Sequence, residues 1–316
     1  MLAAGGTISS IDGAAGRPGA ASTLDAAALV GAVPGLEHVE ARSVLALNGP
    51  QITLDDALAL ATAACEESAR GRGVVVTSGT DTIEELAVLT DAMCGGGPPV
   101  VFTGAIRPAS ATGADGPANL NDAAAVAATA PDGLGTVVCF AGELHAARAV
   151  RKVDSTAPHA FGSPRGGPVG RVVEGRVEVA FLPARHVAVR PERLDFFVPI
   201  VPTWLGDDGA LLRAAFGLGP NGVVLVALGA GHLPPPTLAA LRDAPQGVPV
   251  VGAVRPERGA FLRATYGFEG AERDVLDAGV LPAAHLSPPA ARMLLLAALG
   301  AGFGREELAA LLAVGI

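Results

Sequence analysis

Positive charge and aromatic rings are both scarce in this sequence of 316 residues. Acidic residues outnumber basic ones by 31 to 22, the formal net charge is −9, and only 4% of the residues are aromatic. Proteins that bind nucleic acids neutralise phosphates with basic side chains and stack bases on aromatic rings. The composition therefore argues against nucleic acid as a partner. Half of the residues are apolar, enough for a large core, and the length suggests about two domains.

Cysteine and histidine occur without the spacing of a metal site. The three cysteines, Cys65, Cys94 and Cys139, form no CxxC pair, and the six histidines form no HExxH motif. We therefore expect no bound metal and no cofactor. We also expect the three cysteines to be small core residues in a protein of a reducing compartment.

Long apolar runs are missing as well. The most apolar late stretch, 293–304, falls short of the roughly 18 residues that a membrane span requires. The N-terminus lacks the basic region and apolar run of a secretory leader. The sequence thus predicts a cytoplasmic protein with no membrane partner.

Short β-branched runs alternate with longer Ala/Leu-rich stretches, which is the pattern of βαβ units. We therefore predict an α/β fold, with a mostly parallel, doubly wound N-terminal sheet and a smaller α/β C-terminal domain. The catalytic N-terminal domain is expected over 1–185 and the C-terminal domain over 203–316. The segment 186–202 between them is proline-punctuated and is expected to be a linker.

The individual elements follow from the same alternation. The predicted strands are 73–76, 99–103, 135–140, 177–182, 222–228 and 248–254. The predicted helices are 55–68, 83–93, 118–128, 236–243, 289–299 and 306–314.

Lysine is the rarest of the charged residues, because 21 of the 22 basic residues are arginine and Lys152 is the single lysine. An ammonium group can lose its proton when it is desolvated, and a guanidinium group cannot. Lys152 is therefore a candidate for proton transfer, although an exposed cation would read the same way.

Three polar, glycine-rich loops follow predicted strands, at 5–10, 77–82 and 104–120. Ligands of parallel sheets bind at the carboxyl ends of the strands, so these loops could line one cleft. In the second loop, Thr82 and Glu85 have capping-box spacing, and Thr80 and Asp81 stand just before a helix N-terminus, where an oxyanion is favoured. A threonine with a base nearby can be an acyl-transfer nucleophile. The alternative is that these residues only cap the helix.

The order and spacing of several motifs now identify a resemblance over nearly the whole chain. The motifs are Gly5-Gly6-Thr7-Ile8, Ser78-Gly79-Thr80-Asp81-Thr82 with Glu84-Glu85, Gly104-Ala105-Ile106-Arg107-Pro108, Ala114-Asp115-Gly116-Pro117 with Asn119-Leu120, and Arg151-Lys152 before Gly167-Pro168-Val169-Gly170. The chain resembles the bacterial-type L-asparaginase (asparaginase/glutaminase) family. The resemblance implies hydrolysis of the side-chain amide of L-asparagine through an acyl-enzyme, without a cofactor.

The resemblance also implies residue roles. Thr7 is similar to the first nucleophilic threonine of the family. Thr80, Asp81 and Lys152 match a second group, in which the lysine relays protons through the threonine and the aspartate holds the substrate's α-amino group. The family's substrate-binding positions correspond to Gln51, to Asp81, to the backbone of Ala105 next to the oxyanion, and to Glu272. In the family that glutamate reaches the site of a neighbouring subunit, so a homodimer or homotetramer with sites at subunit interfaces is expected.

Some positions depart from the family pattern. The loop 11–23 contains no tyrosine to assist Thr7, and Pro50 stands where a serine commonly binds the substrate's α-carboxylate. Proline offers no hydrogen-bond donor. Two alternatives to an L-asparaginase therefore stay open: a related amidase that acts on another small or peptide-linked amide, and a catalytically weakened amino-acid-binding protein of the same fold.

Overall fold

The structure, a computed structural model, describes residues 1–13 and 18–315 and divides into two compact units, Met1–Ala188 and Val189–Gly315. Both units are α/β, so the predicted fold class is confirmed. The division falls inside the segment 186–202 that was predicted to be a linker. The last three residues of that segment form a strand instead, β13 (Ile200–Pro202).

Within the described residues, the first unit is built on an eight-stranded sheet. Its strands, in spatial order, are β12 (Arg176–Val179), β11 (Gly170–Val173), β8 (Glu143–Ala146), β7 (Thr136–Phe140), β6 (Val100–Thr103), β5 (Val74–Thr77), β1 (Leu2–Gly5) and β4 (Arg42–Leu47). The last five of these run parallel, and β7, β8, β11 and β12 pair antiparallel. The carboxyl ends of four neighbouring parallel strands, β6, β5, β1 and β4, therefore share one edge.

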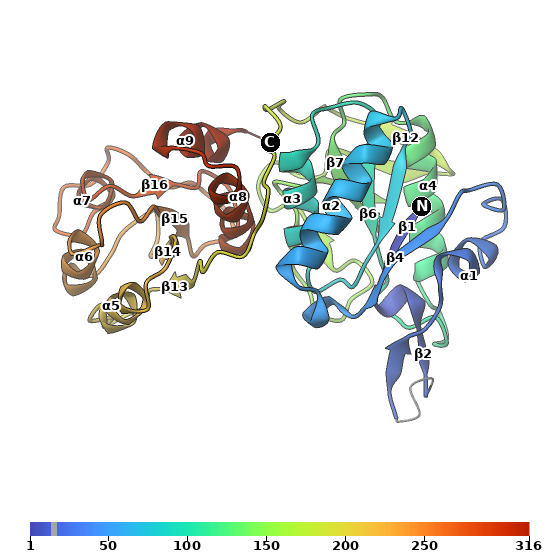
Figure 1. The fold of residues 1–316 in the computed structure, drawn as a ribbon, viewed down its shortest axis with the longest axis horizontal. Helices are drawn as coiled ribbons and strands as arrows, with labels where there is room; N and C mark the ends of the chain where they lie inside the picture. The colour runs from blue at the N-terminus through green and yellow to red at the C-terminus, as the bar shows by residue number, and fades with distance from the viewer. Residues whose placement is uncertain (14–17, 316) are drawn as a thin grey trace. The chain divides into compact units, whose positions relative to one another are not determined.

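Helices cover both faces of this sheet (Figure 1). The helices α2 (Leu54–Ala69) and α3 (Ile83–Met93) lie on one face, and α1 (Ala26–Gly31) and α4 (Gly116–Thr129) on the other. The central strands are short runs of valine with both faces buried, as expected for parallel strands between two helical layers. Val75 and Val101 pack into the core with Leu29 of α1 and Leu120 of α4.

The second unit has a smaller, four-stranded parallel sheet in the order β13, β14 (Val223–Ala227), β15 (Val250–Val254), β16 (Leu281–Pro282) among the residues described. Its helices are α5 (Ala210–Gly217), α6 (Pro235–Arg242), α7 (Glu272–Asp277), α8 (Pro288–Gly300) and α9 (Arg305–Ala313). Leu225 of the sheet packs with Phe216 and Leu238 in one core. Over 1–13 and 18–315, no helix is both long and apolar enough to cross a membrane.

Two small antiparallel pairs complete the first unit. The strands β2 (Ser10–Asp12) and β3 (Ala20–Ser22) form a hairpin just after β1. The strands β9 (Arg151–Lys152) and β10 (Phe161–Gly162) form a second pair, with Phe161 opposite Lys152. Phe161 is buried, and its ring lies 4.9 Å from that of Phe140. The aromatic contact fixes β10, and through it β9, against the main sheet.

A buried polar cluster holds the end of the first unit. The carboxylate of Asp91 on α3 accepts hydrogen bonds from Arg148 and from His186, both at 2.9 Å. Burial alone would raise the pKa of Asp91, but the hydrogen bond from His186 and the charge of Arg148 outweigh it, and the pKa lies below its usual value. The chain therefore remains attached to the first unit as far as His186.

Two of the cysteines form a disulfide, which the sequence did not predict. Cys65 of α2 and Cys94, directly after α3, are bonded, with Cα atoms 5.1 Å apart. The expectation of three free core cysteines is wrong for this pair, because the contact depends on the packing of α2 against α3 and not on sequence spacing. Cys139 is free and buried on β7, and burial raises the pKa of its thiol.

The disulfide predicts a defined thiol count and a measurable stabilisation. It closes a loop of 29 residues, for which the chain-entropy model gives about 3.6 kcal/mol. We expect one titratable thiol in unfolded, non-reduced protein and all three after reduction. Reduction should also lower the melting temperature by roughly 7–14 °C. In a Cys65→Ala/Cys94→Ala double variant the reductant should have no effect on melting, and three thiols without reduction would contradict the bond.

Candidate active site

One cavity collects loops from the carboxyl ends of four neighbouring parallel strands. It has a volume of about 230 Å³, a size suited to a small molecule. The residues that line it follow β1, β4, β5 and β6, together with two from β9 and the loop after it. They are Gly6, Thr7, Asn48, Gly49, Pro50, Gly79, Thr80, Asp81, Ile106, Lys152 and Ser155. This position agrees with the rule that ligands of parallel sheets bind at the carboxyl edge.

The loops after β1, β4 and β5 meet backbone to backbone at three glycines. A Cβ built on Gly6 would lie 2.3 Å from the nitrogen of Gly79, and one on Gly79 would lie 2.8 Å from the nitrogen of Gly49. Gly6 also has a φ of +88°, which side chains rarely allow. The absence of side chains at these points lets Thr7 and Thr80, the next residues of their loops, open onto the same cavity.

Lys152 forms the electrostatic centre of the cavity. Its Nζ donates to Thr80 Oγ1 at 2.9 Å and to Asp81 Oδ1 at 2.7 Å. Thr80 is buried, and the Lys152 side chain is only 18% exposed, whereas the Asp81 side chain is 60% exposed. The lysine and threonine are thus shielded from water, and the carboxylate faces it. A hydroxyl next to an amine that can exchange its proton is the arrangement that acyl transfer requires.

Thr7 begins a single 3-10 turn, Thr7–Ser9, that follows β1. The turn is fixed by its neighbours, since the hydroxyls of Ser9 and Ser10 both donate to the carbonyl of Gly6 at 2.9 Å. Thr7 lines the same cavity as Thr80, but no hydrogen bond joins the two threonines in the part of the chain that the structure describes. Residues 14–17 of the loop 11–23, where the family's tyrosine is missing, lie outside the described residues.

The capping box expected at α3 is not formed. Thr82 is the N-cap, but its side chain makes no capping hydrogen bond, and its hydroxyl oxygen is buried without a partner among the residues described. The backbone of Thr82 has φ −124° and ψ 6°, outside the extended conformation that directs an N-cap side chain toward the helix. The side chain of Thr82 therefore does not cap α3.

Two predicted substrate-binding residues of the first unit do not line the cavity. Gln51 belongs to a 3-10 turn, and its Oε1 accepts from the backbone and side-chain nitrogens of Asn48 at 3.0 and 3.1 Å. Ala105 is fully buried behind Ile106. The loop that carries it is held by Asp115, which accepts from the backbone of Ile106 at 3.0 Å, and by Asn119, which donates to the carbonyl of Gly104 at 3.0 Å.

Sequence reasoning missed three side chains that line the cavity: Asn48, Ile106 and Ser155. Asn48 follows β4, a strand that was not predicted, so its loop was not recognised as a strand-end loop. Ser155 lies in a turn after β9, where Asp154 accepts from the backbone of Thr156 at 2.7 Å. An Asp whose side chain accepts from the backbone two residues later is typical of such a turn, so Asp154 was the signal in the sequence that could have indicated the turn at Ser155.

Glu272 belongs to the second unit and is fully buried there. Its Oε1 accepts from the backbone N–H groups of Thr265 and Tyr266, and its Oε2 lies 3.3 Å from Nε2 of His232. Burial would raise the pKa of Glu272, but the two backbone donors and His232 lower it below its usual value. Tyr266, the only tyrosine, packs its ring edge-on against His232. Within its own unit, Glu272 therefore orders the loop that contains Tyr266.

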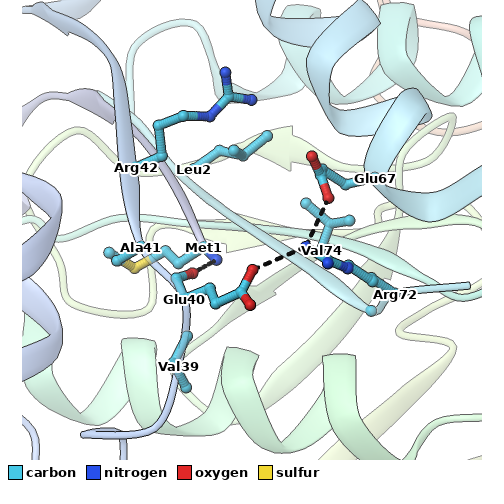
Figure 2. A pocket seen from close by; sticks show the side chains of 10 residues that line it. Met1, Leu2, Val39, Glu40, Ala41, Arg42, Glu67, Arg72 and Val74 are labelled. Carbon is cyan, nitrogen blue, oxygen red and sulfur yellow. Dashed lines mark hydrogen bonds and ion pairs between the residues drawn. The ribbon is translucent and has the colours of Figure 1, made fainter. Parts of the chain in front are cut away.

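A larger cavity, of about 470 Å³, lies at the opposite end of β1 and β5 (Figure 2). Three of its charged side chains bind one another, since Arg72 contacts Glu40 at 2.8 Å and Glu67 at 3.2 Å, and the N-terminal ammonium donates to the carbonyl of Glu40. None of the described residues that line this cavity carries a hydroxyl nucleophile. Nowhere in the described ranges do three or more His, Cys, Asp or Glu side chains gather in a way that could hold a metal ion.

Comparison with known proteins places this arrangement in a family. Residues 1–184 match the N-terminal asparaginase domain, and residues 197–312 match the glutaminase/asparaginase C-terminal domain. The chain belongs to the asparaginase family. This asparaginase is 36% identical to a probable L-asparaginase of Deinococcus radiodurans, over 100% of this chain and 97% of the relative. It is 30% identical to L-asparaginase 2 of Escherichia coli, over 95% of this chain and 88% of that protein.

A solved structure shows the same fold. The crystal structure of a probable cytoplasmic L-asparaginase from Campylobacter jejuni matches with a TM-score of 0.85 at 27% identity, covering 99% of this chain and 98% of that one. The family membership makes this asparaginase a hydrolase that acts on amides.

The glycine contacts predict that a single methyl group impairs the site. Gly79→Ala should push the loop after β5 away from Gly49, and a displacement of about 1 Å can lower kcat on the order of 100-fold. Gly31→Ala is the matched control, because a Cβ at Gly31 meets no atom within 4 Å. Ammonia release from L-asparagine, measured beside the melting temperature, checks this. Wild-type kcat in Gly79→Ala would contradict the close approach.

Proposed function

We propose that this asparaginase hydrolyses the side-chain amide of L-asparagine to L-aspartate and ammonia, through a threonine nucleophile and an acyl-enzyme. The observation that supports it most is the contact of Lys152 with Thr80 and Asp81 in a cavity that Thr7 also lines. L-Asparagine as the substrate is supported by the Deinococcus and Escherichia relatives, which are named a probable L-asparaginase and L-asparaginase 2.

Four residues that line the cavity have roles in the proposed reaction. The oxygen of Thr7 attacks the amide carbon, the C–N bond breaks, and the nitrogen takes up a proton and leaves as ammonia. Water then attacks the resulting ester, which releases aspartate and restores the Thr7 hydroxyl. Thr80 and Lys152 carry protons to and from the reacting atoms, since Nζ and Oγ1 are 2.9 Å apart. Asp81 binds the substrate's α-amino group, for which its exposed carboxylate is suited.

A related amide is the second candidate substrate, and Pro50 favours it. Pro50 lines the cavity, and its ring nitrogen can donate no hydrogen bond to a substrate carboxylate. Gln51, one residue later, is not among the residues that line the cavity, so it does not offer the carboxylate a donor in place of Pro50. A substrate whose α-carboxylate is part of an amide or ester bond would lose less binding free energy at this position than free asparagine would.

We infer further that the asparaginase is a homodimer or homotetramer with sites at subunit interfaces, where Glu272 contributes to substrate binding in a neighbouring subunit. The support is that Glu272 keeps one oxygen, Oε2, directed at His232 and not at a backbone donor. Tyr266 and Phe268 around it are 44% and 51% exposed, unusual for large rings.

A cytoplasmic location is part of the proposal, and it is the location in the name of the Campylobacter protein. The name of another relative, from Haemophilus influenzae and 32% identical over 95% of this chain, is that of a periplasmic protein. The bond between Cys65 and Cys94 is the observation that opposes a cytoplasmic location, because structural disulfides persist in oxidising compartments. The thiol count of protein alkylated inside intact cells distinguishes the two compartments.

Removal of either member of the proton-transfer pair should abolish most of the activity. Thr80→Val and Lys152→Met should each lower kcat on the order of 10²- to 10⁴-fold, the range for general acid–base catalysis. Thr62→Val, on the exposed surface of α2, is the matched control and should keep wild-type activity. The measurement is coupled ammonia release with L-asparagine, D-asparagine and L-glutamine. Full activity in either variant refutes the proton-transfer roles.

Shared sites predict complementation between two inactive variants. Thr7→Ala and Glu272→Gln chains should each have low activity, but co-expressed chains should form oligomers in which some sites receive Thr7 from one subunit and Glu272 from another. About a quarter of the sites would then be intact in a dimer. Ammonia release from the mixed protein no greater than the mean of the two parents would contradict an interfacial site.

A further inference from the structure

Glu84 lies in the first turn of α3, three residues after Asp81. Its carboxylate accepts a hydrogen bond from the backbone N–H of Lys152. It is not among the residues that line the cavity of Thr7 and Thr80. Glu84 therefore contacts the candidate active site through the main chain of Lys152 and lies behind the surface that a substrate would meet.

The strand that carries Lys152 is short. β9 is two residues long and pairs along one edge with β10, where Val153 donates to the carbonyl of Ala160 at 2.7 Å. The N–H of Lys152 points to Glu84 on the neighbouring helix. Buried backbone N–H groups require an acceptor, and here a helix side chain supplies it. The contact thus ties β9 to the start of α3, which also carries Thr80 and Asp81 just before it.

The environment of Glu84 is unusual for a carboxylate. Its Oε2 is buried, and within the described part of the chain no hydrogen-bond donor reaches it. Burial raises the pKa of Glu84 to about 7 and is the largest influence on it. The other charged groups that act on it are Arg151 and Lys152 of β9, which lower the pKa, and Glu85 of its own helix, which raises it.

We propose that Glu84 is a positioning residue for the amide hydrolysis, because its hydrogen bond to the backbone of Lys152 keeps the lysine Nζ at 2.9 Å from Thr80 Oγ1. The inference rests on the proposed function, since the position of Lys152 matters to turnover only where Lys152 and Thr80 transfer protons. Glu84 itself touches neither the substrate nor the reacting atoms.

The turnover rate should depend on pH through the ionisation of Glu84. A carboxylate is a stronger hydrogen-bond acceptor than a neutral carboxyl group, so the Lys152 backbone is held best when Glu84 is ionised. Glu84 loses its proton at about pH 7. We therefore expect kcat of the wild-type enzyme to rise through an inflection near pH 7.

The test is Glu84→Gln, which keeps the size and one acceptor oxygen but cannot ionise. We expect kcat for L-asparagine at pH 8.5 to fall about tenfold, KM to stay unchanged, and the inflection near pH 7 to disappear. Glu85→Gln is the matched control, because it removes an equal charge from the same first turn of α3. Its pH profile should keep the inflection, moved to a lower pH because the charge of Glu85 raises the pKa of Glu84.

The melting temperature shows whether a lower kcat in Glu84→Gln comes from loss of positioning or from loss of the folded state. The pKa of Glu84 in the folded protein is raised above its value of 4.5 in the unfolded chain, so ionisation weakens the folded state as the pH rises from 4.5 through 7. Glu84→Gln cannot ionise and escapes that loss. At pH 8.5 its melting temperature should therefore equal or exceed that of the wild type, and a lower kcat cannot come from unfolding.

Each remaining outcome decides the matter. Wild-type kcat with the inflection intact in Glu84→Gln overturns the proposal, as does a raised KM with unchanged kcat, which would indicate contact with the substrate. Loss of the inflection in Glu85→Gln would show that Glu84 is not the residue whose titration causes it, and this result would also overturn the proposal. Thr80→Val is measured in the same assay: if that variant stays active, the proposed function fails, independently of the result for Glu84.

Discussion

The contact between loops at Gly6, Gly49 and Gly79 is the constraint on which the candidate site depends. Each loop leaves a different parallel strand, and backbone meets backbone where they converge. A side chain at Gly6 would need space that the backbone of Gly79 already fills. Because Gly6 and Gly79 immediately precede Thr7 and Thr80, the close packing of the main chain brings both threonines to one cavity.

The second requirement is a cation that is largely shielded from water, since only 18% of the Lys152 side chain is exposed. Lys152 is stable there because it donates to both Thr80 and Asp81. Those partners come from the loop between β5 and α3, whereas Lys152 comes from a short strand 71 residues further along the chain. The site therefore joins the start of α3 to a two-residue strand, and the contact of Glu84 with Lys152 lies between them.

The elements that position the site were largely predictable, because hydrophobic runs and loop glycines are local signals. The helix over 83–93 was predicted at its observed bounds, and residues of the loops predicted after β1, β5 and β6 line one cavity. What failed depends on tertiary packing or on backbone angles: the Cys65–Cys94 bond, the uncapped Thr82 and the cavity-lining Asn48. The sequence spacing of two cysteines does not encode that their helices are adjacent, and a capping motif does not fix its own φ and ψ.

The charge inventory of the cavity limits how a substrate can bind. Among the residues that line it, Lys152 and Asp81 are the charged ones, and they neutralise each other. In the proposed mechanism, a substrate ammonium group that binds the exposed face of Asp81 competes with Lys152 for the same carboxylate. Binding would then weaken the ion pair and leave Lys152 with Thr80 as its remaining partner. Substrate binding and proton transfer would then be coupled, because the same Asp81 carboxylate binds the substrate ammonium group and holds Lys152.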